Sequence, residues 1–170
     1  GYALYKRSDR NETLVWEEKA PVSAARSVYD GAVGLNNKIY LMGGSSGETK
    51  ATYVYLPSSD SWIRLSDMNS AHIAGAYAET GGKIFAIGGS QNPTSLEIYD
   101  PVLDQWIAGP AVPQPVKYCS AISLNGVIYV VGCRISDTNS DRIFAYDSLS
   151  QTWSEKSNMP TARHAASLVV

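Results

Sequence analysis

Residues able to do acid–base, metal or nucleophilic chemistry are few in this chain and stand far apart. The 170 residues contain two histidines, His72 and His164, and two cysteines, Cys119 and Cys133. A histidine that acts as a general base needs a partner within hydrogen-bond reach, and a structural zinc site needs about four closely spaced Cys or His ligands. Neither pattern is present in the sequence. We therefore predict no catalytic residue, no metal site and no cofactor, and we interpret both histidines as polar residues of turns.

One segment resembles a phosphate-binding loop only superficially. Residues 43–50 read GGSSGETK, whereas such a loop needs the spacing GxxxxGK[ST] between a strand and a helix. The spacing differs, and no helical pattern follows. Asp60, Asp100, Asp104 and Asp147 recur at matching places in the sequence, which indicates turn residues rather than a paired acid and base.

Composition restricts the class of protein further. Lys and Arg number 14 and Asp and Glu 16, so the net charge of −2 offers no basic field for a nucleic acid. Hydrophobic residues make up 44% and charged residues 18%, which excludes a disordered tail. The richest apolar stretch, 127–131, is too short to span a bilayer, so no membrane insertion is expected. The compartment is left open, with the cytoplasm as the working assignment.

The sequence repeats itself with a regular period. Its four tryptophans stand at positions 16, 62, 106 and 153, in steps of 46, 44 and 47. A tyrosine precedes each of the last three by seven residues, and an apolar run ending in glycine lies further upstream. The residues that mark the repeats are Tyr55, Trp62, Tyr99, Trp106, Tyr146 and Trp153, with the glycines Gly43, Gly44, Gly88, Gly89 and Gly132. Strand-rich repeats of this length are typical of propeller blades.

Each repeat is predicted to form four antiparallel strands. The first two are joined by a pair of residues that tolerate the positive φ angles of a tight hairpin turn. These pairs are Asn36–Asn37, Gly81–Gly82 and Asn125–Gly126. The second strand is an almost continuous apolar run, which indicates burial on both faces between neighbouring sheets. The third strand carries the tyrosine and the fourth the tryptophan, so the predicted fold class is all-β.

These motifs resemble the kelch repeat, in which a glycine doublet follows an apolar strand and a tyrosine precedes a tryptophan. The resemblance covers residues 16–170 and departs from the pattern at Leu56, where Asp is usual, and at Cys133, where the second glycine is missing. It implies a kelch-type β-propeller in which the repeated glycines, tyrosines and tryptophans are structural. We expect one partial propeller over 1–170, with blades at approximately 17–62, 63–106 and 107–153, residues 1–16 ending a preceding blade and residues 154–170 starting a following one.

Three blades do not close a ring. Closed propellers use about four to eight blades, and the outer faces of unpartnered blades would expose large apolar patches. We therefore expect the chain to be part of a larger propeller. The alternative is completion by another copy or another chain.

The two cysteines are predicted to be unpaired. If Asn125 and Gly126 form the hairpin turn, Cys119 stands opposite Gly132, and strand alternation sends Cys119 and Cys133 to opposite faces of the sheet. A disulfide is therefore not expected. Both cysteines are interpreted as small apolar fillers.

The loops before each first strand and after each glycine doublet are predicted to emerge on one face, which we call the loop face. These loops are rich in Ser, Asn, Gly and Thr, and adaptable polar loops on a rigid scaffold commonly form binding surfaces. The candidate partner-binding residues are Arg26, His72, Lys117 and Arg163 before the first strands, and Ser45, Ser90 and Arg134 after the doublets.

The predicted function is a protein–protein interaction module that binds an acidic or polar peptide segment on the loop face. The resemblance supports this prediction, because kelch propellers of substrate-adaptor proteins bind peptides on the corresponding face, often through basic residues and serines. The resemblance also leaves open a carbohydrate-binding or sugar-modifying propeller, similar to kelch epimerases and oxidases. Tyr118, Cys119 and the two histidines fall short of the ligand set of a copper radical oxidase, so an enzyme is not expected.

Overall fold

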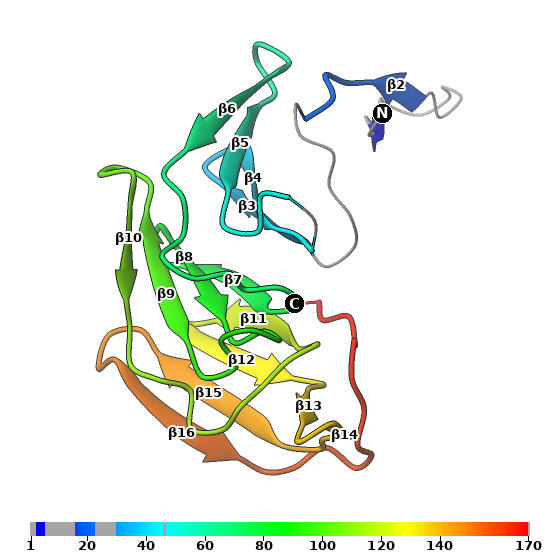
Figure 1. The fold of residues 1–170 in the computed structure, drawn as a ribbon, viewed down its shortest axis with the longest axis vertical. Helices are drawn as coiled ribbons and strands as arrows, with labels where there is room; N and C mark the ends of the chain where they lie inside the picture. The colour runs from blue at the N-terminus through cyan, green and yellow to red at the C-terminus, as the bar shows by residue number, and fades with distance from the viewer. Residues whose placement is uncertain (1–2, 6–15, 23–29, 46, 170) are drawn as a thin grey trace.

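Three four-stranded antiparallel sheets follow one another along the chain, one for each repeat (Figure 1). The computed structural model describes residues 3–5, 16–22, 30–45 and 47–169. Blade 1 contains β3 (Asp30–Leu35), β4 (Lys38–Gly43), β5 (Thr52–Leu56) and β6 (Ser61–Leu65). Blade 2 contains β7 (Ala76–Thr80), β8 (Lys83–Ile87), β9 (Leu96–Asp100) and β10 (Gln105–Ala108). Blade 3 contains β11 (Ser120–Leu124), β12 (Val127–Val131), β15 (Ile143–Asp147) and β16 (Thr152–Lys156). The prediction of an all-β fold with four strands in each repeat is confirmed.

Among the described residues, two short pairs of strands lie outside the three blade sheets. β13 (Arg134–Ile135) pairs with β14 (Thr138–Asn139) in the segment between β12 and β15. β1 (Ala3–Tyr5) pairs with β2 (Trp16–Glu18), so Trp16 begins a strand rather than ending one.

The segment after β16 forms no strand over residues 157–169. A first blade strand draws its hydrogen bonds from the second strand beside it, and the described residues contain no such strand for this segment. Its assignment to a following blade stays a prediction. No helix in the described part of the chain is long and apolar enough to cross a bilayer.

The hairpin turns and glycine doublets adopt the backbone that the sequence predicts. Asn36 and Asn37 have φ angles of 51° and 57°, as a type I′ turn requires at both central positions. In the second doublet, Gly89 has a φ of 112°. A Cβ atom there would lie 2.8 Å from the carbonyl oxygen of Ile73, so glycine lets the loop that enters blade 2 pack on the end of β8.

The core lies between neighbouring blades rather than within one. Tyr40 on β4 packs against Tyr99 on β9, with ring centres 6.1 Å apart. Phe85 on β8 packs in the same way against Tyr146 on β15, at 5.8 Å. The second strands are therefore the main source of contacts between blades.

Each fourth-strand tryptophan joins its blade to the linker that enters it. The indole nitrogen donates a hydrogen bond to a linker carbonyl oxygen in all three blades. The pairs are Trp62 with Ala20 at 2.9 Å, Trp106 with Ser66 at 3.2 Å, and Trp153 with Pro110 at 3.0 Å. These bonds tie the outer strand of each blade to the chain arriving from the blade before.

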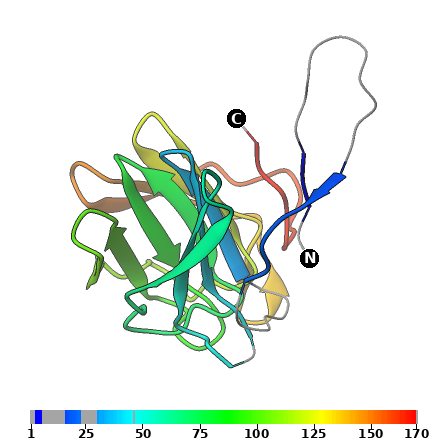
Figure 2. The same cartoon turned by 90° about the horizontal axis from the view of Figure 1, so that it is seen from above.

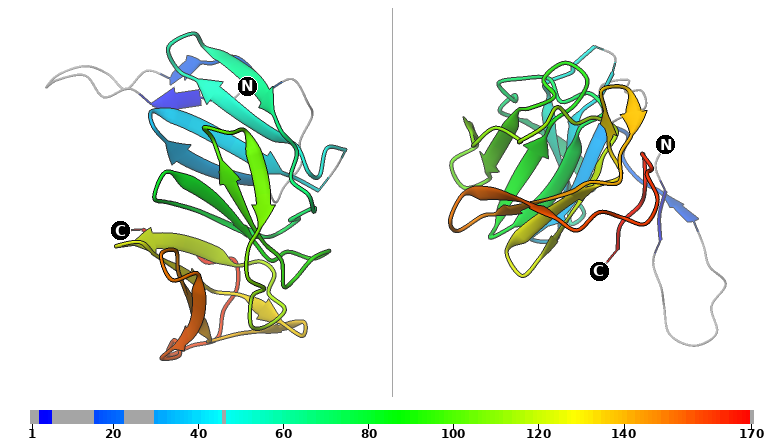
Figure 3. Two further views of the ribbon diagram at one scale, coloured as in Figure 1. Left: turned by 90° about the vertical axis from the view of Figure 1, so that its left-hand side faces the viewer. Right: turned by 90° about the horizontal axis from the view of Figure 1, so that it is seen from below.

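The blades fan out from their first strands. β7 contacts both β3 and β11, so the three first strands lie side by side (Figures 2 and 3). The fourth strands β6, β10 and β16 lie at the outer edge of the fan (Figure 1). Because every first strand runs in the same direction within its blade, the loops that enter the blades gather on one side.

Candidate functional site

The loop face is supported by repeated backbone contacts between blades. In each of the three blades, the loop after the second strand accepts a backbone hydrogen bond from the segment that follows the fourth strand. These bonds run from Met68 N to Lys50 O at 2.8 Å, from Val112 N to Thr94 O at 2.9 Å, and from Met159 N to Asp141 O at 2.7 Å. The surface loops are therefore held on a common framework.

A second repeated contact aligns the loops that enter blades 2 and 3 with the segment after β16. Ala74, Tyr118 and Ala165 all have left-handed φ angles, of 57°, 55° and 51°. Tyr118 N donates to Ala74 O at 2.7 Å, and Ala165 N donates to Tyr118 O at 2.9 Å. The positions two residues earlier are occupied by His72, Val116 and Arg163. Lys117 thus stands one position after the counterpart of His72.

His72 is buried, which corrects its prediction as a partner-binding residue. Its side chain has no exposed area. Nδ1 lies 2.7 Å from the carbonyl oxygen of Gly88, and Nε2 lies 3.3 Å from Glu97 Oε1. The counterparts in blade 3 are Val116 and Phe144, both fully buried in one apolar cluster. The same interior space is filled by a polar pair in blade 2 and by apolar side chains in blade 3.

Glu97 is the buried carboxylate that fastens the loop entering blade 2. It is 2% exposed and accepts hydrogen bonds from Asn69 N at 2.8 Å and Ser70 N at 2.7 Å. Burial raises the pKa of Glu97, but the hydrogen bonds from His72, Asn69 and Ser70 outweigh burial and hold that pKa below its usual value. Glu97 is not among the residues predicted from the sequence, although a lone charge within the apolar third strand was a visible signal.

Lys117 and Arg134 lie side by side on the loop face of blade 3. Their backbones exchange two hydrogen bonds, from Arg134 N to Lys117 O at 2.8 Å and from Lys117 N to Arg134 O at 3.3 Å. Lys117 Nζ lies 2.6 Å from Asp137 Oδ1, and the Arg134 guanidinium donates to the Asp137 carbonyl oxygen. The hydrogen bond from Lys117, followed by its charge, lowers the pKa of the Asp137 carboxyl.

Arg163 approaches the same hairpin from the C-terminal segment. Its backbone N donates to Ser140 O at 3.1 Å, and Ser140 N donates to Cys133 O at 2.9 Å. The Arg163 side chain is exposed. The backbones of Lys117 and Arg163 thus lie beside the segment that contains Arg134 and the β13–β14 hairpin, while the Arg163 guanidinium donates to Thr161 O at 3.4 Å. We call these three cationic residues with Asp137 the basic cluster.

The remaining predicted residues do not join the basic cluster. Ser45 and Ser90 are exposed and occupy the place of Arg134 in blades 1 and 2, so they lie along the face. Arg26 falls outside the described residues. His164 is exposed and meets the Tyr118 ring edge-on, with ring centres 6.2 Å apart.

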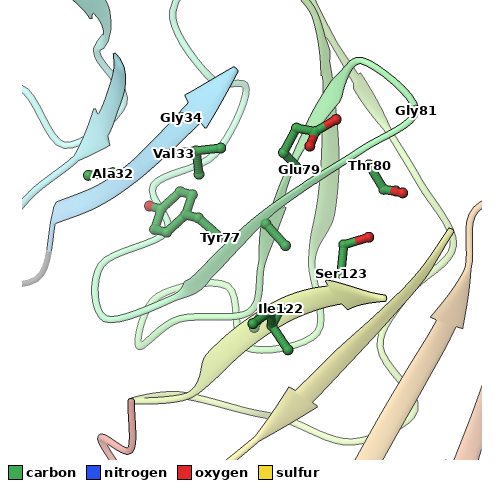
Figure 4. Close-up of a pocket in the computed structure, with 11 residues that line it drawn as sticks. Ala32, Val33, Gly34, Tyr77, Glu79, Thr80, Gly81, Ile122 and Ser123 are labelled. Atoms are coloured by element: carbon green, nitrogen blue, oxygen red, sulfur yellow. The ribbon is translucent and has the colours of Figure 1, made fainter. Parts of the chain in front are cut away.

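A hollow follows the first strands β3, β7 and β11 (Figure 4). Glu79, Thr80 and Ser123 supply its polar groups, and Tyr77 lies near Val33 on its apolar side. Glu79 accepts a hydrogen bond from Gly82 N at 3.1 Å. Within the described part of the chain, no three His, Cys, Asp or Glu side chains gather closely enough to bind a metal ion. The absence of a metal site stays a prediction.

Cys119 and Cys133 form a disulfide, so the prediction of unpaired cysteines is wrong. β11 and β12 pair in the predicted register, but neither cysteine lies in a regular strand. The neighbouring Tyr118 and Gly132 have φ angles of 55° and 61°. Strand alternation therefore ends before both cysteines, and their Cα atoms lie 4.2 Å apart.

Comparison with known proteins identifies the repeat. The kelch motif family matches residues 31–69 and 115–160, half of the chain. The chain belongs to the kelch-motif family. The predicted resemblance and the kelch propeller architecture are thereby confirmed.

Several curated kelch proteins are similar to this chain over most of its length. Mouse Kelch-like protein 35 is 29% identical over 81% of this chain and 24% of its own length. Beta-scruin of Limulus polyphemus is 28% identical over 82% of this chain and 17% of its own length. An F-box/kelch-repeat protein of Arabidopsis thaliana is 26% identical over 90% of this chain and 47% of its own length. The chain thus spans less than half the length of each of these relatives.

A solved structure shares the fold. The structure of YjhT superposes with a TM-score of 0.80 at 15% identity, covering 95% of this chain and 61% of that one. At this level of identity the likeness shows the kelch propeller fold alone.

Proposed function

We propose that this kelch chain is a protein-interaction module whose loop face binds an acidic peptide segment of a partner protein. The basic cluster carries the proposal, because it brings the backbones of three cationic residues to one hairpin in a chain whose net charge is −2. Complementary charge at a binding face speeds association and selects among partners. The exposed serines Ser45 and Ser90 extend the same face with hydroxyl groups.

Asp137 indicates how a partner carboxylate would be held. Its oxygen lies 2.6 Å from Lys117 Nζ, while its side chain is 74% exposed. An exposed ion pair of this kind contributes only about 0–1 kcal/mol. A partner carboxylate can therefore displace Asp137 from Lys117, and Asp137 competes with the partner for the same cation.

Fluorescence anisotropy with labelled synthetic peptides tests the proposal. The probe is a peptide of alternating Glu and Ser, compared with the same peptide carrying Gln in place of Glu. We expect the wild-type chain to prefer the Glu peptide and Lys117→Ala to weaken its binding severalfold. Asp137→Asn should tighten binding, because Asn removes the competing charge and tolerates the left-handed φ of 62° at this position.

Lys38→Ala is the matched control, because Lys38 is exposed at the start of β4, at the opposite end of the blade from the loop face. Its affinity for the Glu peptide should equal that of the wild-type chain. Equal binding of the Glu and Gln peptides, or equal losses for the two lysine variants, would contradict the proposal. Sugar binding or turnover in a glycan screen, without a preference for the Glu peptide, would favour the carbohydrate alternative.

A further inference from the structure

Both cysteines stand at positions that blade 2 fills with glycine. The first position directly precedes the first strand of blades 2 and 3, and the second ends the glycine doublet. The corresponding residues of blades 2 and 1 are Gly75 and Asp30 for Cys119, and Gly89 and Gly44 for Cys133. Blade 3 therefore differs from blade 2 at two positions together.

In blade 2 the packing explains why both positions hold glycine. A Cβ atom on Gly75 would lie 2.9 Å from the carbonyl oxygen of His72, and one on Gly89 would lie 2.8 Å from that of Ile73. Both positions face packed backbone. In blade 3 each position carries a side chain, and the two side chains are bonded to each other. The paired difference indicates that the two cysteines work as a unit.

The two sulfur-bearing residues differ in access. Cys133 is fully buried within the core cluster between blades 2 and 3. Cys119 is half-buried and lines a hollow at the loop-face end of the first strands, together with Ser120 and Ala166. Cys119 is therefore the more accessible of the two cysteines, and the end of the bond at which we expect a reagent to attack.

The disulfide is adjacent to the two central cations of the basic cluster. Lys117 precedes Cys119 by two residues, and Arg134 directly follows Cys133. The Lys117–Arg134 bridge and the disulfide thus connect the same two backbone segments at neighbouring places. Two free thiols cannot stay at the distance of a covalent bond, so opening the disulfide must shift one segment. Core packing holds Cys133, which leaves the segment of Cys119 and Lys117 to move.

We propose that Cys119–Cys133 is a thiol–disulfide exchange site, opened by a dithiol reductant, whose state sets the positions of Lys117 and Arg134. Its effect on partner binding rests on the proposed function, whereas the exchange chemistry does not.

In the exchange, a thiolate of the reductant attacks Cys119 Sγ and forms a mixed disulfide. The Cys119–Cys133 bond breaks, and its electron pair leaves on Cys133 Sγ, which takes up a proton. The second thiolate of the reductant then attacks the reductant sulfur of the mixed disulfide. This step releases Cys119 as a thiol and closes the reductant to a disulfide, so two electrons pass from the reductant to the cysteine pair.

Native reduction tests the site directly. The folded chain is treated with dithiothreitol, alkylated with iodoacetamide and weighed by mass spectrometry, while amide hydrogen exchange is followed over residues 116–120, where Val116, Lys117 and Tyr118 donate backbone hydrogen bonds. We expect two added alkyl groups and severalfold faster exchange in this segment. With glutathione, the mixed disulfide should map to Cys119. No alkylation of the folded chain, or alkylation with unchanged exchange over 116–120, would overturn the proposal.

Two double variants complete the test. Cys119→Ser with Cys133→Ser should show the fast exchange of the reduced chain and ignore dithiothreitol. Cys119→Gly with Cys133→Gly introduces the residues of blade 2 and should ignore the reductant as well. Slow, wild-type exchange over 116–120 in the Ser variant would show that the bond does not hold the segment and would overturn the proposal.

The binding readout separates the two proposals. If the Glu peptide binds with severalfold different affinity to the oxidised and reduced chains, and the Ser variant matches the reduced chain, control of the cluster is supported. Equal affinity of the oxidised and reduced chains would show that the disulfide does not control peptide binding, while leaving the proposed function intact. If the peptide binds neither state, the proposed function fails, and the alkylation and exchange results still decide whether the site exists.

Discussion

The Tyr146 hydroxyl lacks a hydrogen bond that the corresponding tyrosines of blades 1 and 2 make. In blades 1 and 2 the third-strand tyrosine hydroxyl donates to an Asp in the following turn. The pairs are Tyr55 with Asp60 at 2.6 Å and Tyr99 with Asp104 at 2.7 Å. In blade 3 the counterpart of the Asp is Gln151, and the Tyr146 hydroxyl is buried without a partner among the described residues.

The linker into blade 3 gives a physical reason for this change. Asp104 also accepts a hydrogen bond from Ser66 N at 2.9 Å. The residue in the place of Ser66 before blade 3 is Pro110, which has no N–H to donate. A carboxylate at position 151 would thus accept one hydrogen bond fewer than Asp104 does. Asp is therefore expected to stabilise blade 3, relative to Gln, by less than it stabilises blade 2.

We expect Gln151→Asp to stabilise the chain by about 1 kcal/mol, because it gives the buried Tyr146 hydroxyl an acceptor. Asp also suits the φ of 57° at this position better than Gln does. A double-mutant cycle in urea isolates the hydrogen bond. Tyr146→Phe should be nearly neutral in the wild-type chain and destabilising in the Gln151→Asp variant. Equal effects in both backgrounds would show that no bond forms.

The loop that enters blade 2 depends on β9 for its position. The backbone N–H groups of Asn69 and Ser70 donate hydrogen bonds to the Glu97 carboxylate, and His72 Nε2 lies 3.3 Å from the same carboxylate. The loop is thereby held by a charge, in addition to the apolar packing of the buried Met68 and Ala71. In blade 3 the corresponding loop carries the buried Val116 instead and is ordered by burial. One loop conformation is thus supported by two different kinds of interaction, and only the first depends on pH.

We expect Glu97→Gln to lower the free energy of unfolding by about 1.5–3 kcal/mol at neutral pH, the usual contribution of hydrogen bonds to a charged group. The folded-state pKa of Glu97 lies below its usual value. The carboxylate therefore stabilises the fold above about pH 4.5, and this contribution is lost as the pH falls through the folded-state pKa. Urea unfolding of both chains across this range should show the difference shrinking in acid.

Glu79→Gln is the control for this pH series, because Glu79 lies in the hollow and accepts one backbone hydrogen bond, from Gly82. Its effect on stability should be smaller at neutral pH. A Glu97→Gln difference that stays constant from neutral to acid pH would contradict the assigned role of the charge.

The outer face of blade 3 repeats a surface that is covered in the other blades. Tyr40 and Phe85 each pack on a third-strand tyrosine of the following blade. Tyr129 occupies the same place on β12 and remains partly exposed. This face of β12 therefore carries the same kind of surface that is buried between blades 1 and 2 and between blades 2 and 3. We take this as support for the expectation that further blades cover it.

We expect the chain made alone to associate and to elute in size-exclusion chromatography above its mass of 18.4 kDa. Tyr129→Glu should reduce this association, because an unpaired carboxylate is costly to bury against another blade. Tyr129→Phe keeps the apolar ring and should associate like the wild-type chain. A stable wild-type monomer would argue against both a continuing propeller and completion by a second copy.

The repeat pattern predicted most of the fold because it reports local physics. Positive φ at Asn36 and Asn37, burial of both faces of β8 and the outer place of the tryptophans all follow from residue type and spacing. His72 was misplaced because a polar side chain at a loop looks exposed in sequence. Its burial depends on Glu97, 25 residues later, and no local pattern connects the two.

The amino-acid order alone determined the all-β class, the four strands of each repeat and the kelch resemblance, since each rests on contacts within a few residues or on strict periodicity. Tertiary structure decided three further points: the approach of the backbones of Lys117, Arg134 and Arg163 to one hairpin, the burial of His72, and the bond between Cys119 and Cys133. Each of the three depends on a segment outside the regular strands and on its contact with another segment that is distant in the sequence. That meeting is set by packing between blades, which sequence spacing does not encode.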